Sequence, residues 1–302
     1  MSAAAGEGGT ARVTARAALV ESNGLRFRVV QAGPERGPLV LLLHGFPEGA
    51  GCWRHQIGAL AAAGYRVWAP DQRGYGESAR PDGVRQYRLP VLAADAFGLL
   101  DAAGVASARV VAHDWGGAVA WWMAQARPDR VERLAILNCP HPAVMRRALF
   151  TNPRQMLRSW YMALFQLPWL PEALLGAGDG ALLARGLRTS SRQGAFSDAD
   201  LAAYRRDWRR PGALRAMIDW YRAARYPLRM GGRVGAAAEP RVQPPTLLLW
   251  GRRDRALGAE LAQPTLARCA HGRLVFLDAA THWLQHEEPA RINAALLEHL
   301  AG

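Results

Sequence analysis

The chain has 302 residues, half of them hydrophobic and 21% charged, which excludes disordered, collagen-like and coiled-coil proteins. The 38 basic residues, all of them arginine, exceed the 25 acidic ones by 13, but no recognisable nucleic-acid-binding motif accompanies them. We therefore expect no nucleic-acid partner, and since no apolar run approaches ~18 residues we expect no integral membrane segment.

Short apolar runs rich in Val, Leu and Ile alternate with helical patterns along most of the chain. This alternation predicts an α/β protein with a mostly parallel, eight-stranded sheet and helices on both faces. The predicted strands are 17–21, 26–31, 39–43, 66–69, 109–112, 132–137, 246–250 and 273–277. The predicted helices are 53–63, 90–103, 115–126, 259–269 and 289–300.

The alternation of strands and helices is interrupted once, between His141 and Pro245. A gap of this length cannot be a structureless loop in a compact domain, and its Ala, Leu, Arg, Trp and Tyr content favours helices. We therefore predict a core formed by residues 1–142 and 237–302, with a helical cap at 143–236 inserted between its two parts.

Positive charge concentrates in this predicted cap. Between Ala143 and Arg233, 16 arginines face six acidic residues, so ten of the 13 net charges lie in one third of the chain. A concentrated positive field attracts anions, which favours an anionic small-molecule substrate. The alternative is that the arginines reflect only the base composition of the genome.

A strand, a tight turn and a helix meet at His113-Asp114-Trp115-Gly116-Gly117. Small residues around one central side chain are typical of a nucleophile elbow, which lifts the nucleophile above the sheet. A carboxylate that attacks an ester would give a high-energy anhydride, whereas attack on an sp³ carbon with a leaving group gives an ordinary ester. Asp114 as nucleophile therefore predicts an epoxide or an alkyl halide as substrate. The alternative is that Asp114 only caps the helix.

Two polar residues follow the last two predicted strands, namely Asp254 and His282. In open α/β sheets, catalytic groups collect outside the carboxyl ends of the strands. The order Asp114, Asp254, His282 matches nucleophile, acid and histidine. We expect His282 to deprotonate a water molecule and Asp254 to hold its imidazole in the correct tautomer. The weaker base candidates are His113, His44, His141 and His286.

The segment His44-Gly45-Phe46-Pro47 follows the predicted strand 39–43. We expect the backbone N–H groups of Phe46 and Trp115 to form an oxyanion hole for the intermediate of ester hydrolysis. A simple tight turn is the alternative reading of this segment, and the two are compatible.

Jointly, these segments resemble the epoxide hydrolases of the α/β-hydrolase fold, from about Asn23 to the C-terminus. The resemblance rests on His44-Gly45-Phe46-Pro47, Asp71-Gln72-Arg73-Gly74-Tyr75-Gly76-Glu77-Ser78, the segment around Asp114, the late Asp254 and His282, and the long insertion. The chain departs from the usual elbow pattern at Ala112, where a glycine is common. Individually, the motifs are shared with related dehalogenases.

The resemblance implies that two cap tyrosines hold the epoxide oxygen. Tyr161 and Tyr221 lie in the segments similar to those that carry them, with Tyr204 and Tyr226 as alternatives. A hydrogen-bond donor is needed because a bare alkoxide is a poor leaving group in an apolar pocket. The implied reaction requires no cofactor and no metal.

Two other functions stay open at this point. A haloalkane or haloacid dehalogenase would share the Asp nucleophile, but Phe46 stands where many haloalkane dehalogenases have an Asn. A non-catalytic small-molecule receptor is disfavoured by the complete triad. We expect a cytoplasmic protein, because three scattered cysteines without a secretory signal argue against a disulfide framework. We also expect a monomer or a homodimer.

Overall fold

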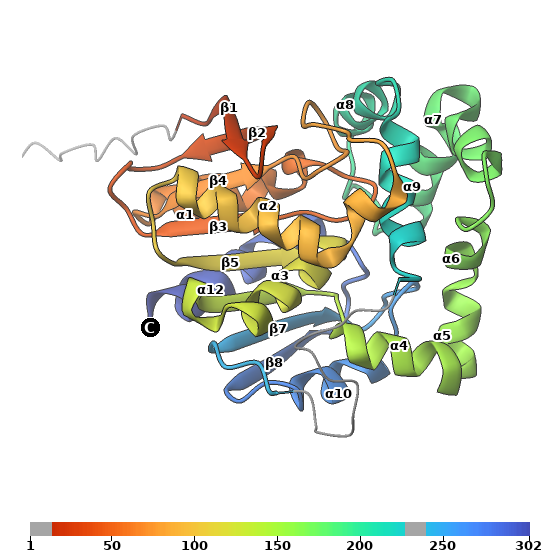
Figure 1. Ribbon diagram of the computed structural model, residues 1–302. Helices are drawn as coiled ribbons and strands as arrows, with labels where there is room; N and C mark the ends of the chain where they lie inside the picture. The colour runs from red at the N-terminus through yellow and green to blue at the C-terminus, as the bar shows by residue number, and fades with distance from the viewer. Residues whose placement is uncertain (1–13, 227–239) are drawn as a thin grey trace, which may run out of the picture.

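The computed structural model describes residues 14–226 and 240–302. One eight-stranded sheet crosses it, with the strand order β1-β2-β4-β3-β5-β6-β7-β8 (Figure 1). The strands are β1 (Arg16–Ser22), β2 (Leu25–Ala32), β3 (Leu39–Leu43), β4 (Arg66–Pro70), β5 (Ala108–His113), β6 (Val131–Leu137), β7 (Thr246–Gly251) and β8 (Gly272–Leu277). All eight predicted strands are confirmed, each to within one residue at either end.

The two ends of the sheet differ in strand direction. β2 pairs antiparallel with β1 and with β4, whereas β4, β3, β5, β6, β7 and β8 pair in parallel. Parallel strands buried on both faces are near-continuous apolar runs, as in β3, all of whose residues are buried. Their carboxyl ends share one edge of the sheet.

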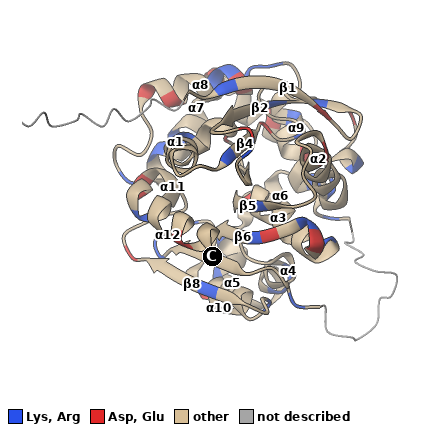
Figure 2. Ribbon diagram, turned by 90° about the vertical axis from the view of Figure 1, so that its left-hand side faces the viewer, with Lys and Arg blue, Asp and Glu red and all other residues tan. Residues whose placement is uncertain are grey.

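Four longer helices cover the sheet, namely α1 (Arg54–Ala62), α2 (Leu89–Ala102), α3 (Trp115–Ala126) and α12 (Pro289–Ala301). α1 and α12 pack on one face, and α2 and α3 pack on the other (Figure 2). Strand residues alternate between the two faces: Leu41 and Leu43 face α2 and α3, while Val40 and Leu42 face α1 and α12.

The predicted helix 259–269 is wrong in extent. A 3₁₀ turn at Ala259–Leu261 precedes the short α10 (Ala262–Leu266), and the chain after it continues in turns. Pro264 explains the break, because proline has no N–H to donate and clashes with the carbonyl four residues earlier in a continuous helix. A second short helix, α11 (Leu284–Glu287), follows β8 and was not predicted.

Between β6 and β7, the described residues form helices and no strand, as predicted. These helices are α4 (Pro142–Thr151), α5 (Pro153–Arg158), α6 (Trp160–Leu164), α7 (Leu170–Ser190), α8 (Asp198–Trp208) and α9 (Ala213–Ala223). Prolines open α4 and α5, where a missing N–H costs nothing, and Ser197 begins α8 with a capping box. The predicted cap boundary at 236/237 lies outside the described residues. No described helix is long and apolar enough to cross a bilayer.

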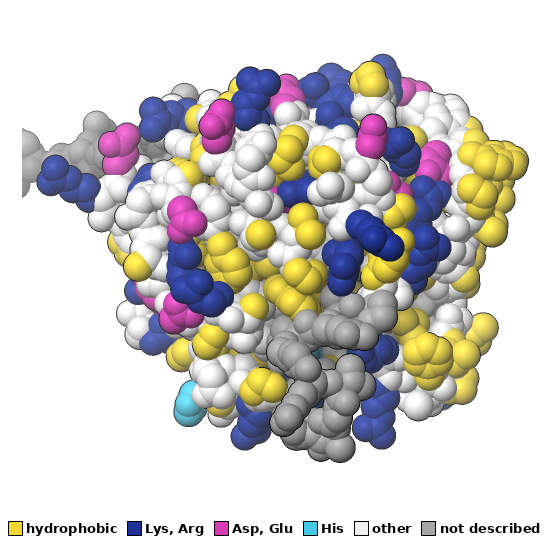
Figure 3. Space-filling model, in the orientation of Figure 1, with side chains coloured by type: hydrophobic (Ala, Val, Ile, Leu, Met, Phe, Trp, Pro, Cys, Tyr) yellow, Lys and Arg dark blue, Asp and Glu magenta, His cyan; other side chains and the backbone are white. Residues whose placement is uncertain are grey.

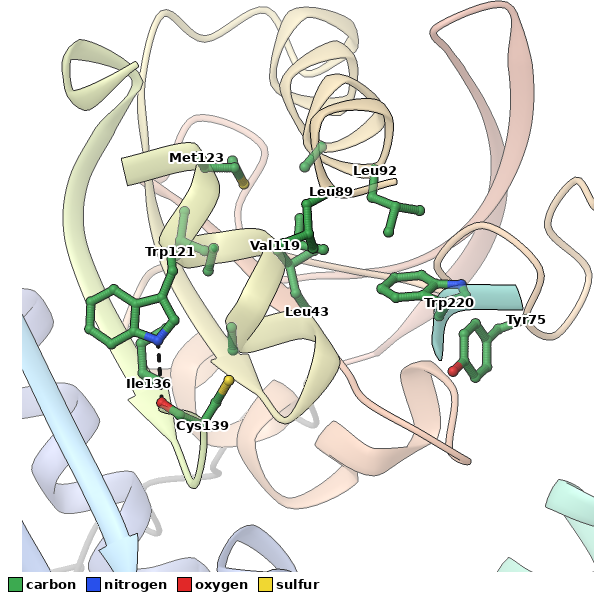
Figure 4. Packing of buried hydrophobic residues seen from close by; sticks show 14 of the residues in the cluster. Leu43, Tyr75, Leu89, Leu92, Val119, Trp121, Met123, Ile136, Cys139 and Trp220 are labelled. Atoms are coloured by element: carbon green, nitrogen blue, oxygen red, sulfur yellow. Dashed lines mark hydrogen bonds between the residues drawn. The ribbon is translucent and has the colours of Figure 1, made fainter. Parts of the chain in front are cut away.

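The inserted helices share a hydrophobic core with the sheet. In Figure 4, Leu43 of β3 and Val119 of α3 pack with Leu89 at the start of α2, and Trp220 of α9 lies near Tyr75. The rings of Trp220 and Tyr75 meet edge to face with centroids 5.7 Å apart. α9 is thereby fixed above the carboxyl ends of the strands.

Candidate active site

Asp114 occupies the turn between β5 and α3, in a backbone conformation that non-glycine residues rarely adopt (φ 49°, ψ −123°). The turn requires the small residues that follow it. A side chain at Gly116 would collide with the carbonyl of Leu43, and one at Gly117 would collide with Cys139. These close approaches give the physical reason for the sequence pattern around Asp114.

Backbone donors hold the carboxylate of Asp114. The N–H of Phe46 donates to Oδ1 at 2.9 Å, and the N–H of Trp115 also donates to the carboxylate. Burial raises the pKa of Asp114, although His282 and these two donors partly oppose it. The two groups predicted to form an oxyanion hole therefore point at the same carboxyl group.

Asp254 and His282 lie beside Asp114, as their positions after β7 and β8 predict. His282 Nδ1 lies 2.7 Å from Asp254 Oδ2, and His282 Nε2 lies 3.7 Å from Asp114 Oδ2. The other oxygen of Asp254 accepts hydrogen bonds from the N–H groups of Ala256 and Leu257, at 2.7 and 2.8 Å. Asp254 is thus fully engaged and fixes one side of the imidazole.

The protonation of His282 is set by its two carboxylate neighbours. Burial disfavours the imidazolium, but Asp254 and Asp114 outweigh it and raise the pKa of His282 to about 9. In this arrangement the ring is a cation at neutral pH. It can act as a base only after the negative charge near it decreases and the ring has released this proton.

Asn138 links the ends of three segments around the site. Its side chain accepts from the N–H of Gly251 at 2.7 Å and donates to the carbonyl of Thr281 at 2.8 Å. The amide therefore ties the end of β6 to the end of β7 and to the loop that carries His282. Sequence reasoning missed this positioning contact of Asn138.

The four histidines named as weaker base candidates each have another partner. His113 contacts the carbonyl of His282 at 2.9 Å, and burial lowers its pKa well below the ordinary value. His44 accepts from the N–H of Gln72, and His141 accepts from the N–H of Ala143 at the start of α4. His286 lies 2.8 Å from the carboxylate of Glu48.

Glu48 is a buried residue that sequence reasoning missed. Burial would raise its pKa, but His286 outweighs burial and lowers the pKa of Glu48 to about 2. The hydroxyl of Tyr204 donates to the same carboxylate at 2.6 Å. Tyr204 is thus turned toward Glu48. The only sequence signal was an acidic residue directly after Pro47.

Tyr161 on α6 and Tyr221 on α9 lie together, with ring centroids 5.8 Å apart and edge to face. Tyr221 also meets Trp115 edge to face at 5.0 Å and Phe46 at 5.3 Å. Burial, with the charge of Asp114, raises the pKa of both phenols. Both hydroxyls are therefore protonated and able to donate over the usual pH range.

Asp114, Tyr161 and Tyr221 line one cavity of about 410 Å³. Its walls are mainly apolar side chains of α3, α4 and α9, and this composition suits a small organic molecule. Among the lining residues are Trp115, Ala118, Trp122, Met145, Leu149 and Phe150. Tyr226 lines the same cavity, and Arg225 and Arg85 lower its pKa.

Comparisons with known proteins find similar sequences and structures. A family model described as alpha/beta hydrolase fold matches residues 38–289. The chain is 45% identical over 282 residues to AB hydrolase superfamily protein YfhM of Bacillus subtilis, covering 93% of this chain and 96% of that protein. It is 37% identical over 320 residues to Epoxide hydrolase A of Mycobacterium tuberculosis, covering 94% and 97%.

Among solved structures, Epoxide Hydrolase A from Mycobacterium thermoresistibile superposes with a TM-score of 0.82. The two sequences are 33% identical, and the match covers 96% of this chain and 99% of that one. The similarity thus extends over the sheet and the inserted helices together.

Proposed function

Because this chain belongs to the epoxide hydrolase family of the α/β-hydrolase fold, we propose that it converts an epoxide to a vicinal diol through a covalent ester on Asp114. The observation that carries this proposal is that Asp114 and both phenols line one cavity. In this proposal the helices between β6 and β7 act as the cap (143–236) over a core of 1–142 and 237–302.

The first step would be alkylation of Asp114. A carboxylate oxygen attacks one epoxide carbon, and the bond between that carbon and the ring oxygen breaks. The leaving oxygen receives a hydrogen bond and then a proton from Tyr161 or Tyr221. Their raised pKa supports this role, because both phenols stay protonated until the alkoxide forms.

Hydrolysis of the ester would follow from the charge change. Ester formation removes the negative charge of Asp114, which is one of the groups that raise the pKa of His282. With its pKa lowered, the imidazolium gives its proton to the phenolate left by the first step. The neutral imidazole then accepts a proton from water, and the hydroxide attacks the acyl carbon of Asp114. The N–H groups of Phe46 and Trp115 stabilise the oxyanion, and the diol leaves with the proton from His282. The acid proton of Asp114 then returns to the imidazole, which restores the carboxylate and the imidazolium.

A single turnover with excess protein in ¹⁸O-labelled water tests the covalent step. We expect the label in the carboxyl group of Asp114 and not in the diol, because water attacks the acyl carbon rather than the substrate. Peptide mass spectrometry locates the label. A labelled diol from the first turnover would mean direct attack by water, with Asp114 acting as a base.

A dehalogenase would share the ester and the same labelling pattern. Measuring halide release from alkyl halides beside diol formation from epoxides separates the two reactions. Halide release without diol formation would overturn the epoxide assignment while leaving Asp114 as the nucleophile.

A further inference from the structure

Three consecutive short helices, α4 to α6, expose large hydrophobic side chains, although such side chains are usually buried. Phe150 on α4 is 80% exposed, Leu157 on α5 is 75% exposed and Trp160 on α6 is 65% exposed. Met156, which precedes Leu157, is also exposed. Figure 3 shows hydrophobic and arginine side chains along the edge that α4 to α6 form in Figure 1. We call these four residues the α4–α6 patch. Clustered exposed apolar side chains mark interaction surfaces.

The chain segment that carries the α4–α6 patch is positively charged. From residue 142 to residue 171 the chain has four arginines and no acidic residue. Arg158 pairs at 3.4 Å with Glu260, which lies outside this stretch of sequence. Arg147 and Arg154 are exposed, and neither forms an ion pair with another residue in the described part of the chain. The patch therefore combines exposed aromatic and aliphatic groups with unneutralised positive charge.

We propose that the α4–α6 patch binds the surface of an anionic phospholipid bilayer. Trp and Phe side chains favour the boundary between lipid headgroups and acyl chains, and arginine side chains reach the phosphate groups. An anionic surface supplies the charge that Arg147 and Arg154 lack in the described structure. The protein would lie on the membrane rather than span it.

A second copy of this chain fits the same surface less well. A two-fold symmetric dimer brings the same patch of both subunits together. The arginines of one subunit would then lie near those of the other with no acidic residue from 142 to 171 to pair with them, and like charges at an interface are costly. The lipid surface satisfies both the apolar and the charged groups.

The position of the patch relates it to the cavity, because Phe150 belongs to both. A bound membrane would lie against the outer wall of the cavity, so an epoxide dissolved in the bilayer would have a short path to Asp114. Only this consequence rests on the proposed function. Binding to the membrane depends on the surface alone.

Flotation of the full chain with vesicles tests the proposal. We expect binding to phosphatidylcholine vesicles that contain 30% phosphatidylglycerol, and much weaker binding to phosphatidylcholine alone. Arg147→Gln with Arg154→Gln should weaken binding roughly fivefold for each arginine, and added salt should weaken it further. Leu157→Glu should weaken it on the order of tenfold, because it places a carboxylate at the lipid boundary.

The matched control is Leu182→Glu on α7, which changes an exposed leucine outside the patch. It should bind as the unchanged protein does, and Asp114→Asn should also bind equally because binding needs no chemistry. Absence of binding to anionic vesicles would overturn the proposal, as would binding that Leu157→Glu leaves intact. A dimer in sedimentation velocity that Leu157→Glu dissociates, without vesicle binding, would instead make the patch a self-association surface.

Discussion

The two regions that meet at the cavity are held in place by different interactions. At the strand ends, backbone N–H groups hold Asp114 and Asp254, and Asp254 holds His282, at distances of 2.7 to 2.9 Å. On the inserted helices, Tyr161 and Tyr221 are placed through packing of their rings. The charged groups therefore stand on the sheet, where parallel pairing sets their positions, and the neutral donors stand on separately packed helices.

This difference predicts that the strand-end region carries the proton transfers of ester hydrolysis and that losing it has the largest effect. His282→Gln should lower turnover by about 10⁴-fold while the epoxide still opens, because ester hydrolysis needs a base. Intact mass spectrometry should show one substrate mass added, and peptide mapping should place it on Asp114.

Two related variants control this experiment. Asp114→Asn should not accumulate the adduct promptly, because it lacks the nucleophile. Asp254→Asn should slow hydrolysis less completely, because the imidazole survives but loses its orienting partner. Turnover of His282→Gln at the unchanged rate would place the base elsewhere, and His113, whose ring centroid lies 4.6 Å from that of His282, is the first residue to examine.

The two phenols of the helical region should partly replace each other, whereas no residue at the strand ends replaces His282. Tyr161→Phe and Tyr221→Phe should each lower the rate by roughly tenfold, because one phenol can still donate, whereas the double variant should lose on the order of 10³-fold. Burst kinetics of ester formation measures the affected step, and thermal unfolding checks that each variant is folded. Tyr204→Phe serves as a control outside the cavity. Full activity of the double variant would remove the phenols from the mechanism.

The same contrast explains what could be predicted from the sequence. Apolar runs located the strands to within one residue, and polar residues directly after them identified Asp254 and His282, because strand ends share one edge. The pair of Glu48 and His286 was missed because its members lie 238 residues apart and belong to no strand end. The exposure of Leu157 could not be predicted either, because the sequence of a six-residue helix does not show which of its sides the rest of the protein covers.

The strand-end region should also make stability depend on pH. The pKa of His282 is raised from 6.5 to about 9 in the folded protein, so the charged ring stabilises the fold. This contribution is complete below pH 6.5, is lost as the pH rises through about 9, and amounts to at most about 3 kcal/mol.

Free energies of unfolding at pH 6 and pH 9.5 measure this contribution. The unchanged protein should lose more stability between these values than His282→Gln, whereas Tyr161→Phe should lose as much as the unchanged protein does, because the Tyr161 phenol stays neutral up to pH 9.5. Equal losses in the unchanged protein and in His282→Gln would show that the imidazolium gains nothing from its two carboxylates.

The smallest effect concerns the charge of the helical region. Because ten of the 13 net positive charges lie between residues 143 and 233, an epoxide that carries a carboxylate should be captured faster than its neutral methyl ester. Raising the salt concentration from 25 to 250 mM should lower kcat/KM for the anion by roughly two- to fivefold and leave that of the ester unchanged, because ions screen the field. An identical salt response of the two substrates would show that the arginines do not steer substrates. The positive charge of the helices would then serve only to bind larger anionic surfaces, or would reflect only the base composition of the genome. The helical region and the strand ends would differ in how their residues are held in place and not in how they attract substrate.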